Sequence, residues 1–221
     1  YYDYEGNETP LLKVLHDNGI NYIRIRIWND PFNADGKTYG GGGNDVSTGV
    51  EIAKEAAQYD MKVLLDFHYS DFWAEPAVQL VPKAWKKDVN NTEKMCSDVY
   101  DFTKESIQKF KDAGANIGMV QVGNEITNGL LGIYSNRDKG ESFNVIWGDK
   151  KKSTEVNKYL KAGIKAVREY TPQALVALHL ETPNVWKYKT IMNTWKRDNV
   201  DYDVLGSSYY PFWSIAAKAN T

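Results

Sequence analysis

Apolar and polar positions along the chain follow two periods, one typical of helices and one typical of buried strands. Helical spacing predicts helices at residues 10–18, 48–59, 92–113, 154–170 and 186–197. Short apolar runs between them predict strands: INYIRIRIW, MKVLLDFHY, NIGMVQVGN, ALVALHLE and YDVLGSSYYP. This alternation is typical of parallel βαβ units, so we expect an α/β protein built on one parallel sheet.

The loops on the two sides of the predicted sheet differ in length. Helix-to-strand connections are short, whereas three strand-to-helix connections are long, at residues 29–47, 70–91 and 127–153. In a (β/α)8 TIM barrel, the loops at the carboxyl ends of the strands build the active site. A doubly wound sheet instead places its ligand at one switch point. Because polar and aromatic residues end every predicted strand, the sequence favours the barrel.

Composition limits the kind of protein without identifying it. The 221 residues are 42% hydrophobic and 25% charged, with no composition shift, so residues 1–221 are expected to form a single domain. A net charge of −2 does not favour nucleic acid as a partner. No apolar run reaches membrane-spanning length, and no signal peptide opens the chain, so no membrane contact is expected.

Individual residue types give weaker indications of function than the strand and loop pattern. The 7 Trp and 15 Tyr residues raise the expectation of a sugar site, because flat aromatic faces pack against the C–H faces of sugars. The single Cys96 is expected to be a buried small hydrophobic residue. The run from Lys150 to Lys152 is expected to be a solvated loop. The glycine run in YGGGGND lacks both a P-loop and a dinucleotide fingerprint, so it predicts a flexible loop at the rim of a cleft.

The stretch MVQVGNEITNG places Asn124 and Glu125 where a buried strand ends. Both residue types commonly cap turns and helix starts, which is one interpretation. At the carboxyl end of a barrel strand, however, a carboxylate is more often catalytic. Glycoside hydrolysis needs two carboxyl groups that flank the scissile bond, one of which protonates the leaving oxygen. The sequence therefore favours a catalytic role for Glu125.

Further candidates stand on the neighbouring strands. Arg24 and Arg26 share one strand parity, so both are expected on the inner face, each with a carboxylate partner. The stretch DFHYSDFW adds Asp66, His68, Asp71 and Trp73. Asp66 is expected either as a buried partner of one arginine or as part of the site, and His68 as a hydrogen-bonding pocket residue. The three histidines lack the spacing of metal ligands, so no metal site is expected.

Seven motifs, in order, resemble glycoside hydrolase family 53, the endo-β-1,4-galactanases: RIRIWNDP, GGGND, KVLLDFHYSDFWAEP, PKAW, MVQVGNEITNG, VALH and DYDVLGSSYYPFW. The resemblance runs from about residue 1 to about residue 213. It implies a (β/α)8 barrel that cleaves internal β-1,4-galactosidic bonds with retention, in the galactan of pectin side chains (type I arabinogalactan). It also implies a secreted or cell-surface enzyme that needs no cofactor for catalysis.

The resemblance also implies roles for single residues. Glu125 is similar to the general acid/base, Asn124 to the amide that contacts the sugar, and Arg24 to the arginine that steadies the nucleophile, with Arg26 as the second choice. It implies substrate contacts at Arg26, Asp66, His68, Asp71, Trp73, Trp85, His179, Tyr209 and Trp213. The segment HLETP, residues 179–183, departs from the family's His-Phe-Thr-Asn-Pro, which leaves the contacts of that loop open.

The family's second carboxylate, the nucleophile, stands on the seventh strand of its barrel. By this resemblance the chain carries strands two to six and lacks strands one, seven and eight. The nucleophile, and the calcium-binding loop of some members, are then expected outside this chain, and the fragment alone is expected to be inactive.

Two alternatives remain open from the residues. One is a catalytically silent carbohydrate-binding fragment. The other is a different barrel enzyme, either a related glycosidase acting on another β-1,4-glycan or an unrelated aldolase or phosphate-binding isomerase. The missing phosphate cradle, and the absence of a lysine at a predicted strand end, disfavour the unrelated enzymes.

Overall fold

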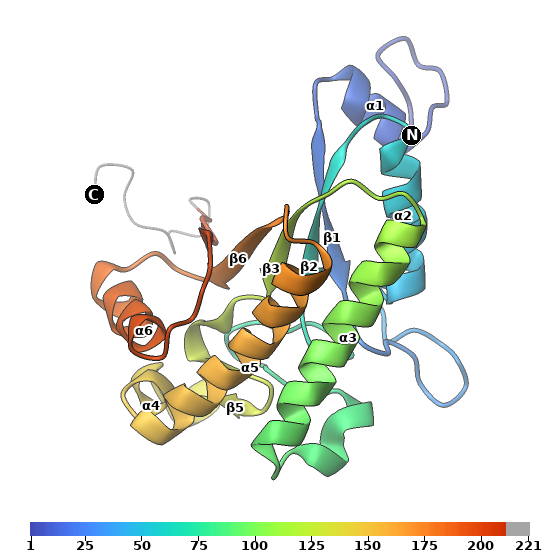
Figure 1. The fold of residues 1–221 in the computed structure, drawn as a ribbon. Helices are drawn as coiled ribbons and strands as arrows, with labels where there is room; N and C mark the ends of the chain where they lie inside the picture. Colours follow the sequence, from blue (N-terminus) through green and yellow to red (C-terminus); the bar gives the residue numbers. More distant parts are fainter. Residues whose placement is uncertain (211–221) are drawn as a thin grey trace.

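The computed structural model describes residues 1–210, in which one parallel sheet forms the centre of the molecule (Figure 1). Its five strands lie in the order β1-β2-β3-β6-β7, and each neighbouring pair is parallel. The strands are β1 (Tyr22–Ile27), β2 (Lys62–Phe67), β3 (Ile117–Val122), β6 (Leu175–Leu180) and β7 (Val204–Ser207). Neighbours in the sheet follow one another along the chain, as they do in a (β/α) barrel.

Helices connect the strands, and α2, α3 and α5 lie side by side over one face of the sheet (Figure 1). The long helices are α1 (Leu11–Asp17), α2 (Val46–Ala57), α3 (Thr92–Asp112), α5 (Lys150–Tyr170) and α6 (Val185–Arg197). Their existence and order agree with the helical spacing. The prediction of a loop at Lys150–Lys152 is wrong, because the side chain of Asp149 accepts the N–H of Lys152 at 3.0 Å and starts α5 there.

The outer face of the sheet forms the core beneath these helices. Alternate residues of β2 and β3, such as Leu65 and Val120, are fully buried. A glycine, Gly163, lets α5 approach closely, because a Cβ there would lie 2.6 Å from the Tyr69 hydroxyl. Cys96 is half-buried against this core, and burial raises the pKa of its thiol to about 11. Each fully buried aliphatic side chain contributes roughly 1.5–3 kcal/mol to the stability of the fold. Burial of this outer face therefore leaves the alternate residues of each strand on the inner face.

The inner face becomes polar towards the carboxyl ends of the strands. Pairing of β1, β2 and β3 aligns Arg26, Asp66 and Gln121 in one row across the sheet. Nearer the amino ends the same face carries Leu64 and Met119, which stay partly exposed. A polar upper layer and a partly exposed lower layer are what we expect for an open part of a barrel.

The long loops contain short helices and strands that the hydrophobic periodicity does not predict. They are η1 (Lys83–Asp88), η2 (Ile126–Asn128), β4 (Gly129–Leu130), β5 (Ile133–Tyr134), η3 (Arg137–Lys139) and α4 (Asn144–Trp147). The β4–β5 hairpin requires glycine at residue 129, where φ is 126° and a Cβ would lie 2.0 Å from the carbonyl oxygen of Ile133. All of these elements follow β2 or β3, at the end of the sheet where the candidate residues gather.

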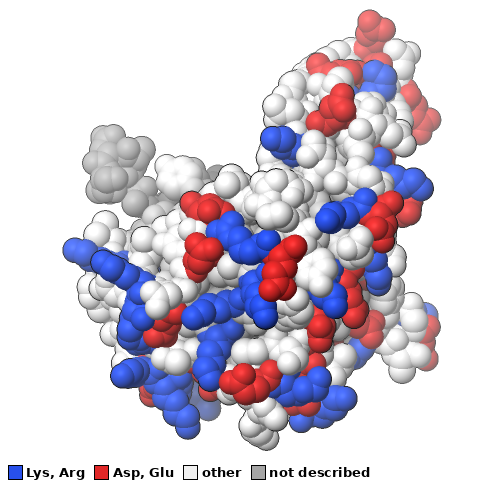
Figure 2. Space-filling view, in the orientation of Figure 1, with Lys and Arg blue, Asp and Glu red and all other residues white. Residues whose placement is uncertain are grey.

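The outer surface of the helices is of mixed charge. Lysine and arginine side chains alternate with aspartate and glutamate over the face that α3 and α5 present (Figure 2). Within residues 1–210, no helix is both long enough and apolar enough to cross a membrane. The face shown in Figure 2 therefore carries charges of both signs.

Candidate active site

Glu125 stands just past the end of β3, in a backbone conformation that glycine usually adopts. Its φ is +47° and its ψ is +48°, the left-handed region. The amide of Gln79, itself buried, donates to the carbonyl of Asn124 at 2.9 Å and to that of Glu125 at 3.4 Å. The side chain of Glu125 makes no capping bond to η2, so the capping interpretation is wrong for this residue. Strain held in place by neighbouring contacts is common at functional sites.

A charged and amide network lies beneath Glu125 on the inner face. One nitrogen of Arg24, Nη2, lies 2.8 Å from Oδ2 of Asp66 and 2.8 Å from Oδ1 of Asn124. The Asp66 carboxylate is completely buried and also accepts from Nε2 of Gln121 at 2.6 Å. The predicted pairing of Asp66 with an arginine is confirmed for Arg24. Because the buried Asp66 carboxylate holds Arg24 in place, the contact of Arg24 with Oδ1 fixes the plane of the Asn124 amide.

His68 is a further hydrogen-bonding partner of Asp66 in this network. Its Nδ1 accepts the backbone N–H of Ala74 at 3.0 Å, so its Nε2 carries the proton and donates to Asp66 at 3.1 Å. The predicted hydrogen-bonding role is confirmed. The ring is only 1% exposed, however, so the prediction that it lines a pocket is wrong. Within residues 1–210, no group of three or more His, Cys, Asp or Glu residues could hold a metal ion.

His179 of β6 and Ser208 after β7 complete the surroundings of Glu125. Nδ1 of His179 lies 2.9 Å from Oδ1 of Asn124, and Nε2 lies 3.0 Å from Oγ of Ser208. The same hydroxyl oxygen lies 2.5 Å from Oε1 of Glu125. Burial, with a further contribution from the Arg24 charge, lowers the pKa of His179 to about 4. His179 is therefore neutral near pH 7.

The environment of Glu125 favours its protonated form. Burial is the main cause that raises the pKa of this carboxyl group, and the charges of Glu181 and Glu75 raise it further. The charge of Arg24 acts in the opposite direction, and so would a hydrogen bond donated by the Ser208 hydroxyl to an ionised Glu125 carboxylate. A carboxyl group whose pKa is moved up towards the working pH can donate a proton to a leaving group.

An aromatic cluster borders the network on the side of β1 and β2. The guanidinium carbon of Arg26 lies 4.1 Å from the ring centre of Trp73, and this indole lies 5.7 Å from that of Trp28. Arg26 forms no ion pair within residues 1–210, so its expected carboxylate partner is replaced by a cation–π contact. Trp73 is 40% exposed, and Gly41 of the glycine run passes next to both indoles. The exposed indole offers a flat apolar surface beside the network.

Four further residues were expected to contact substrate. Asp71 accepts the backbone N–H groups of Asp30 and Lys83, at 3.1 and 2.7 Å, so its carboxylate joins two loops. Trp85 is buried in the core against Tyr69 and Phe102, on the helix side of the sheet. The prediction that Trp85 contacts substrate is therefore wrong. Tyr209 is exposed beyond β7, directly after Ser208, and its substrate contact stays a prediction. Trp213 lies outside the described residues.

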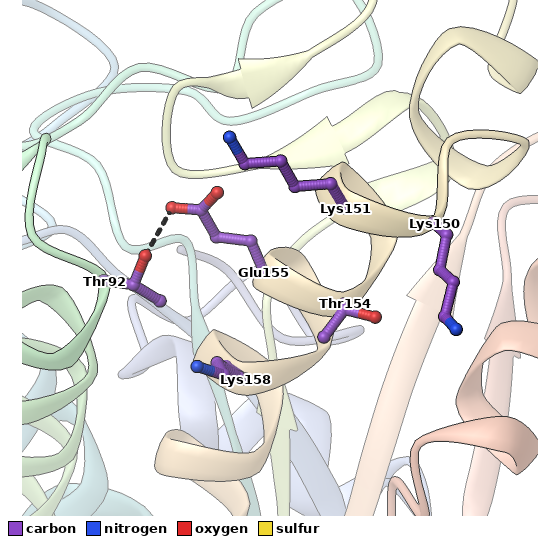
Figure 3. A pocket seen from close by; sticks show the side chains of 6 residues that line it. All are labelled: Thr92, Lys150, Lys151, Thr154, Glu155 and Lys158. Atoms are coloured by element: carbon purple, nitrogen blue, oxygen red, sulfur yellow. Dashed lines mark hydrogen bonds between the residues drawn. The ribbon is translucent and has the colours of Figure 1, made fainter.

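A separate hollow lies between the amino-terminal ends of α3 and α5 (Figure 3). Its volume is about 510 Å³, and its lining includes Lys150, Lys151 and Lys158. Glu155 in this hollow accepts a hydrogen bond from Thr92 at 2.8 Å. None of its lining residues belongs to the network around Glu125, so it is not the candidate site.

Sequence reasoning missed three residues of the site: Gln79, Gln121 and Ser208. Gln121 had a usable signal, because a polar residue inside an otherwise apolar strand is expected to have a buried partner. Gln79 and Ser208 had none. Gln79 sits in a loop of irregular sequence, and the segment Gly206-Ser207-Ser208 is indistinguishable from an ordinary strand end.

Comparisons with known proteins agree with this geometry. The family model described as glycosyl hydrolase family 53 matches residues 1–220. The endo-beta-1,4-galactanase of Bacillus subtilis (strain 168) is 44% identical over 214 residues, which cover 96% of this chain and 46% of that protein. The arabinogalactan endo-beta-1,4-galactanase of Humicola insolens is 30% identical over 229 residues, covering 100% of this chain and 61% of that protein.

A solved structure gives the same result for the fold. The GH53 catalytic domain of Ignisphaera aggregans superposes with a TM-score of 0.84 at 35% identity, covering 96% of this chain and 55% of that domain. The predicted fold, part of a (β/α)8 TIM barrel, is confirmed. The chain spans about half the length of the curated relatives it matches.

Proposed function

Because the chain belongs to glycosyl hydrolase family 53, we propose that the whole protein is an endo-acting glycoside hydrolase that cleaves β-1,4-galactosidic linkages in galactan with retention. The observation that carries the proposal is the carboxyl group of Glu125, half-buried at the carboxyl end of a barrel strand with a raised pKa. The substrate class rests on the relatives, which are named for β-1,4-galactan.

We assign the following roles to the residues of the site. Glu125 donates a proton to the leaving galactosyl oxygen and later accepts one from the attacking water, as retention requires. The Asn124 amide, which Arg24 holds in one orientation, is assigned to bind a hydroxyl group of the sugar next to the scissile bond. Trp73 offers its exposed face to the C–H side of another sugar residue.

Retention needs a second carboxylate, the nucleophile, about 5–5.5 Å from Glu125. The proposal places it in a part of the whole protein outside residues 1–221, as the resemblance implies. The side of the inner face next to β7 is where the following strands of a barrel would stand. Arg24 supports this arrangement, because its positive charge on the inner face would stabilise an ionised carboxylate there.

A substrate panel tests the proposed activity. We expect the whole protein to release oligosaccharides from β-1,4-galactan and to leave β-1,4-glucan and β-1,4-mannan intact. Proton NMR during the first minutes should show the β-anomer of the new reducing end before mutarotation. Binding of galactan without product would instead support a silent carbohydrate-binding protein. Release of the α-anomer first would contradict retention, and release from mannan or glucan alone would contradict the substrate class.

Trp73 gives a prediction for substrate binding. Trp73→Ala should raise KM on galactan about tenfold with little change in kcat, because an indole–sugar contact of roughly 1–2 kcal/mol contributes equally before and in the transition state. Steady-state kinetics on galactan measures the split between kcat and KM. Tyr4→Ala is a suitable control, because this aromatic side chain is 94% exposed and lies on the amino-terminal segment far from β2 along the chain. Equal effects of the two substitutions would contradict the role of Trp73.

A further inference from the structure

We propose that Ser208 is a positioning residue for the acid/base: it links neutral His179 to Glu125 in such a way that the protonated form of the Glu125 carboxyl group is favoured. The inference rests on the proposed role of Glu125 in catalysis and concerns how the proton is held on it. The three side chains come from three separate parts of the chain, at the ends of β3, β6 and β7. The sequence alone does not bring them together.

The chain of hydrogen bonds begins at Asn124, whose amide has only one orientation. Its Nδ2 donates to the carbonyl of Ala74 at 2.8 Å, and its Oδ1 accepts from Arg24 at 2.8 Å. The atom that faces Nδ1 of His179 at 2.9 Å is therefore an oxygen that can only accept. At that distance, Nδ1 of His179 carries the ring proton and donates it.

The direction of the next two bonds then follows. His179 is neutral, so its Nε2 has a lone pair and accepts a hydrogen bond. Ser208 has one hydroxyl proton, and it donates that proton to Nε2 across 3.0 Å. Its oxygen is left as an acceptor, 2.5 Å from Oε1 of Glu125. Only a protonated carboxyl group can donate into that contact, so the network favours the acid form of Glu125.

A second arrangement competes with this one. The backbone N–H of Glu125 and Nε2 of Gln121 also point at Nδ1 of His179, at 3.3 and 3.4 Å. If these contacts prevailed, Nε2 of His179 would carry the proton and Ser208 would donate to an ionised Glu125. The contact of 2.9 Å to the fixed Asn124 oxygen is shorter than either, and it favours the first arrangement. The two arrangements predict opposite effects of removing the Ser208 hydroxyl.

Other charges surround the pair and are the same in both arrangements. The groups that face Glu125 or His179 are Arg24 of β1, Asp66 and His68 of β2 and its loop, Glu75, Glu181 after β6 and Tyr188 of α6. None of them contacts the Ser208 hydroxyl in the described part of the chain. A change in the pKa of Glu125 on removal of that hydroxyl is therefore attributable to the hydroxyl.

Ser208→Ala in the whole protein tests the inference. We expect the basic limb of the pH profile of kcat/KM to move to lower pH by about half a unit to one unit, because a donor–acceptor contact that stabilises the protonated form is lost. Ser208→Thr keeps a hydroxyl group and should restore the profile. Ser207→Ala is the matched control, because the neighbouring hydroxyl bonds to Tyr188 instead, at 2.7 Å. A shift to higher pH, or no shift, would overturn the inference.

A direct titration separates this inference from the proposed function. In protein labelled with carbon-13 at the glutamate carboxyl groups, the Glu125 signal is assigned by its absence in Glu125→Gln. Its pKa should be lower in Ser208→Ala than in the unaltered protein and unchanged in Ser207→Ala. This readout needs no turnover, so it tests the network even if galactan proves not to be the substrate. Matching circular dichroism spectra and melting temperatures show that the variants are folded.

Discussion

Glu125→Gln in the whole protein should lower kcat/KM on galactan by about 10²–10⁴-fold, the range typical of a lost general acid/base. Glutamine has the same shape as glutamic acid but cannot donate a proton to the galactosyl oxygen or accept one from water. The fold should be unchanged, because the Glu125 side chain makes no cap and no ion pair within residues 1–210. Circular dichroism and kinetics on galactan measure the two outcomes.

The chemistry of the leaving group sharpens this prediction. With a dinitrophenyl galactoside the leaving group needs no proton, so the variant should still form the glycosyl-enzyme and then stall. Azide, which needs no general base, should restore turnover and give β-galactosyl azide. Glu155→Gln, an equally half-buried carboxylate in the hollow between α3 and α5, should change activity less than about twofold. Near-normal turnover of galactan by Glu125→Gln would contradict its role.

Arg24→Met should lower the free energy of unfolding by about 2–3 kcal/mol and abolish most activity. The substitution leaves the completely buried Asp66 carboxylate with neutral donors only, from His68 and Gln121. Loss of one partner from a fully buried pair costs roughly 3–5 kcal/mol, and a smaller loss of about 2–3 kcal/mol is expected here because the Arg24 side chain is 42% exposed. Urea unfolding at pH 7 measures the change in stability.

Two further substitutions serve as comparisons for Arg24→Met. Arg24→Lys keeps a positive charge next to Asp66 and should recover part of the stability, but it loses the guanidinium nitrogen Nη2 that contacts both Asp66 and Asn124. Lys158→Met removes an exposed ion pair with Glu93 at 3.1 Å and should cost less than about 1 kcal/mol. If Arg24→Met were as mild as Lys158→Met, the proposed support of Asp66 and Asn124 by Arg24 would be contradicted.

Periodicity was a good guide to the long elements. The strand MVQVGN was identified because aliphatic residues must be buried, and β3 occupies residues 117–122 as expected. Periodicity failed where a single capping bond decided the boundary, as at Asp149, which starts α5 four residues earlier than the apolar pattern indicates. Trp85 was misassigned for a related reason: a tryptophan in a loop can face either side of the sheet, and its contacts with Tyr69 and Phe102 are with distant residues.

The sequence by itself determined the βαβ order and indicated Asn124, Glu125 and Arg24 as candidates for a site at one end of the sheet. These features depend on local spacing and on strand parity, which a chain carries along its length. Only the tertiary structure decided that Arg24 pairs with Asp66, that Gln79 holds the Glu125 backbone, and that Ser208 reaches the Glu125 carboxyl group. Hydrogen bonds act over about 3 Å, and in this network they join residues up to 100 positions apart, so only the packed sheet brings these groups together.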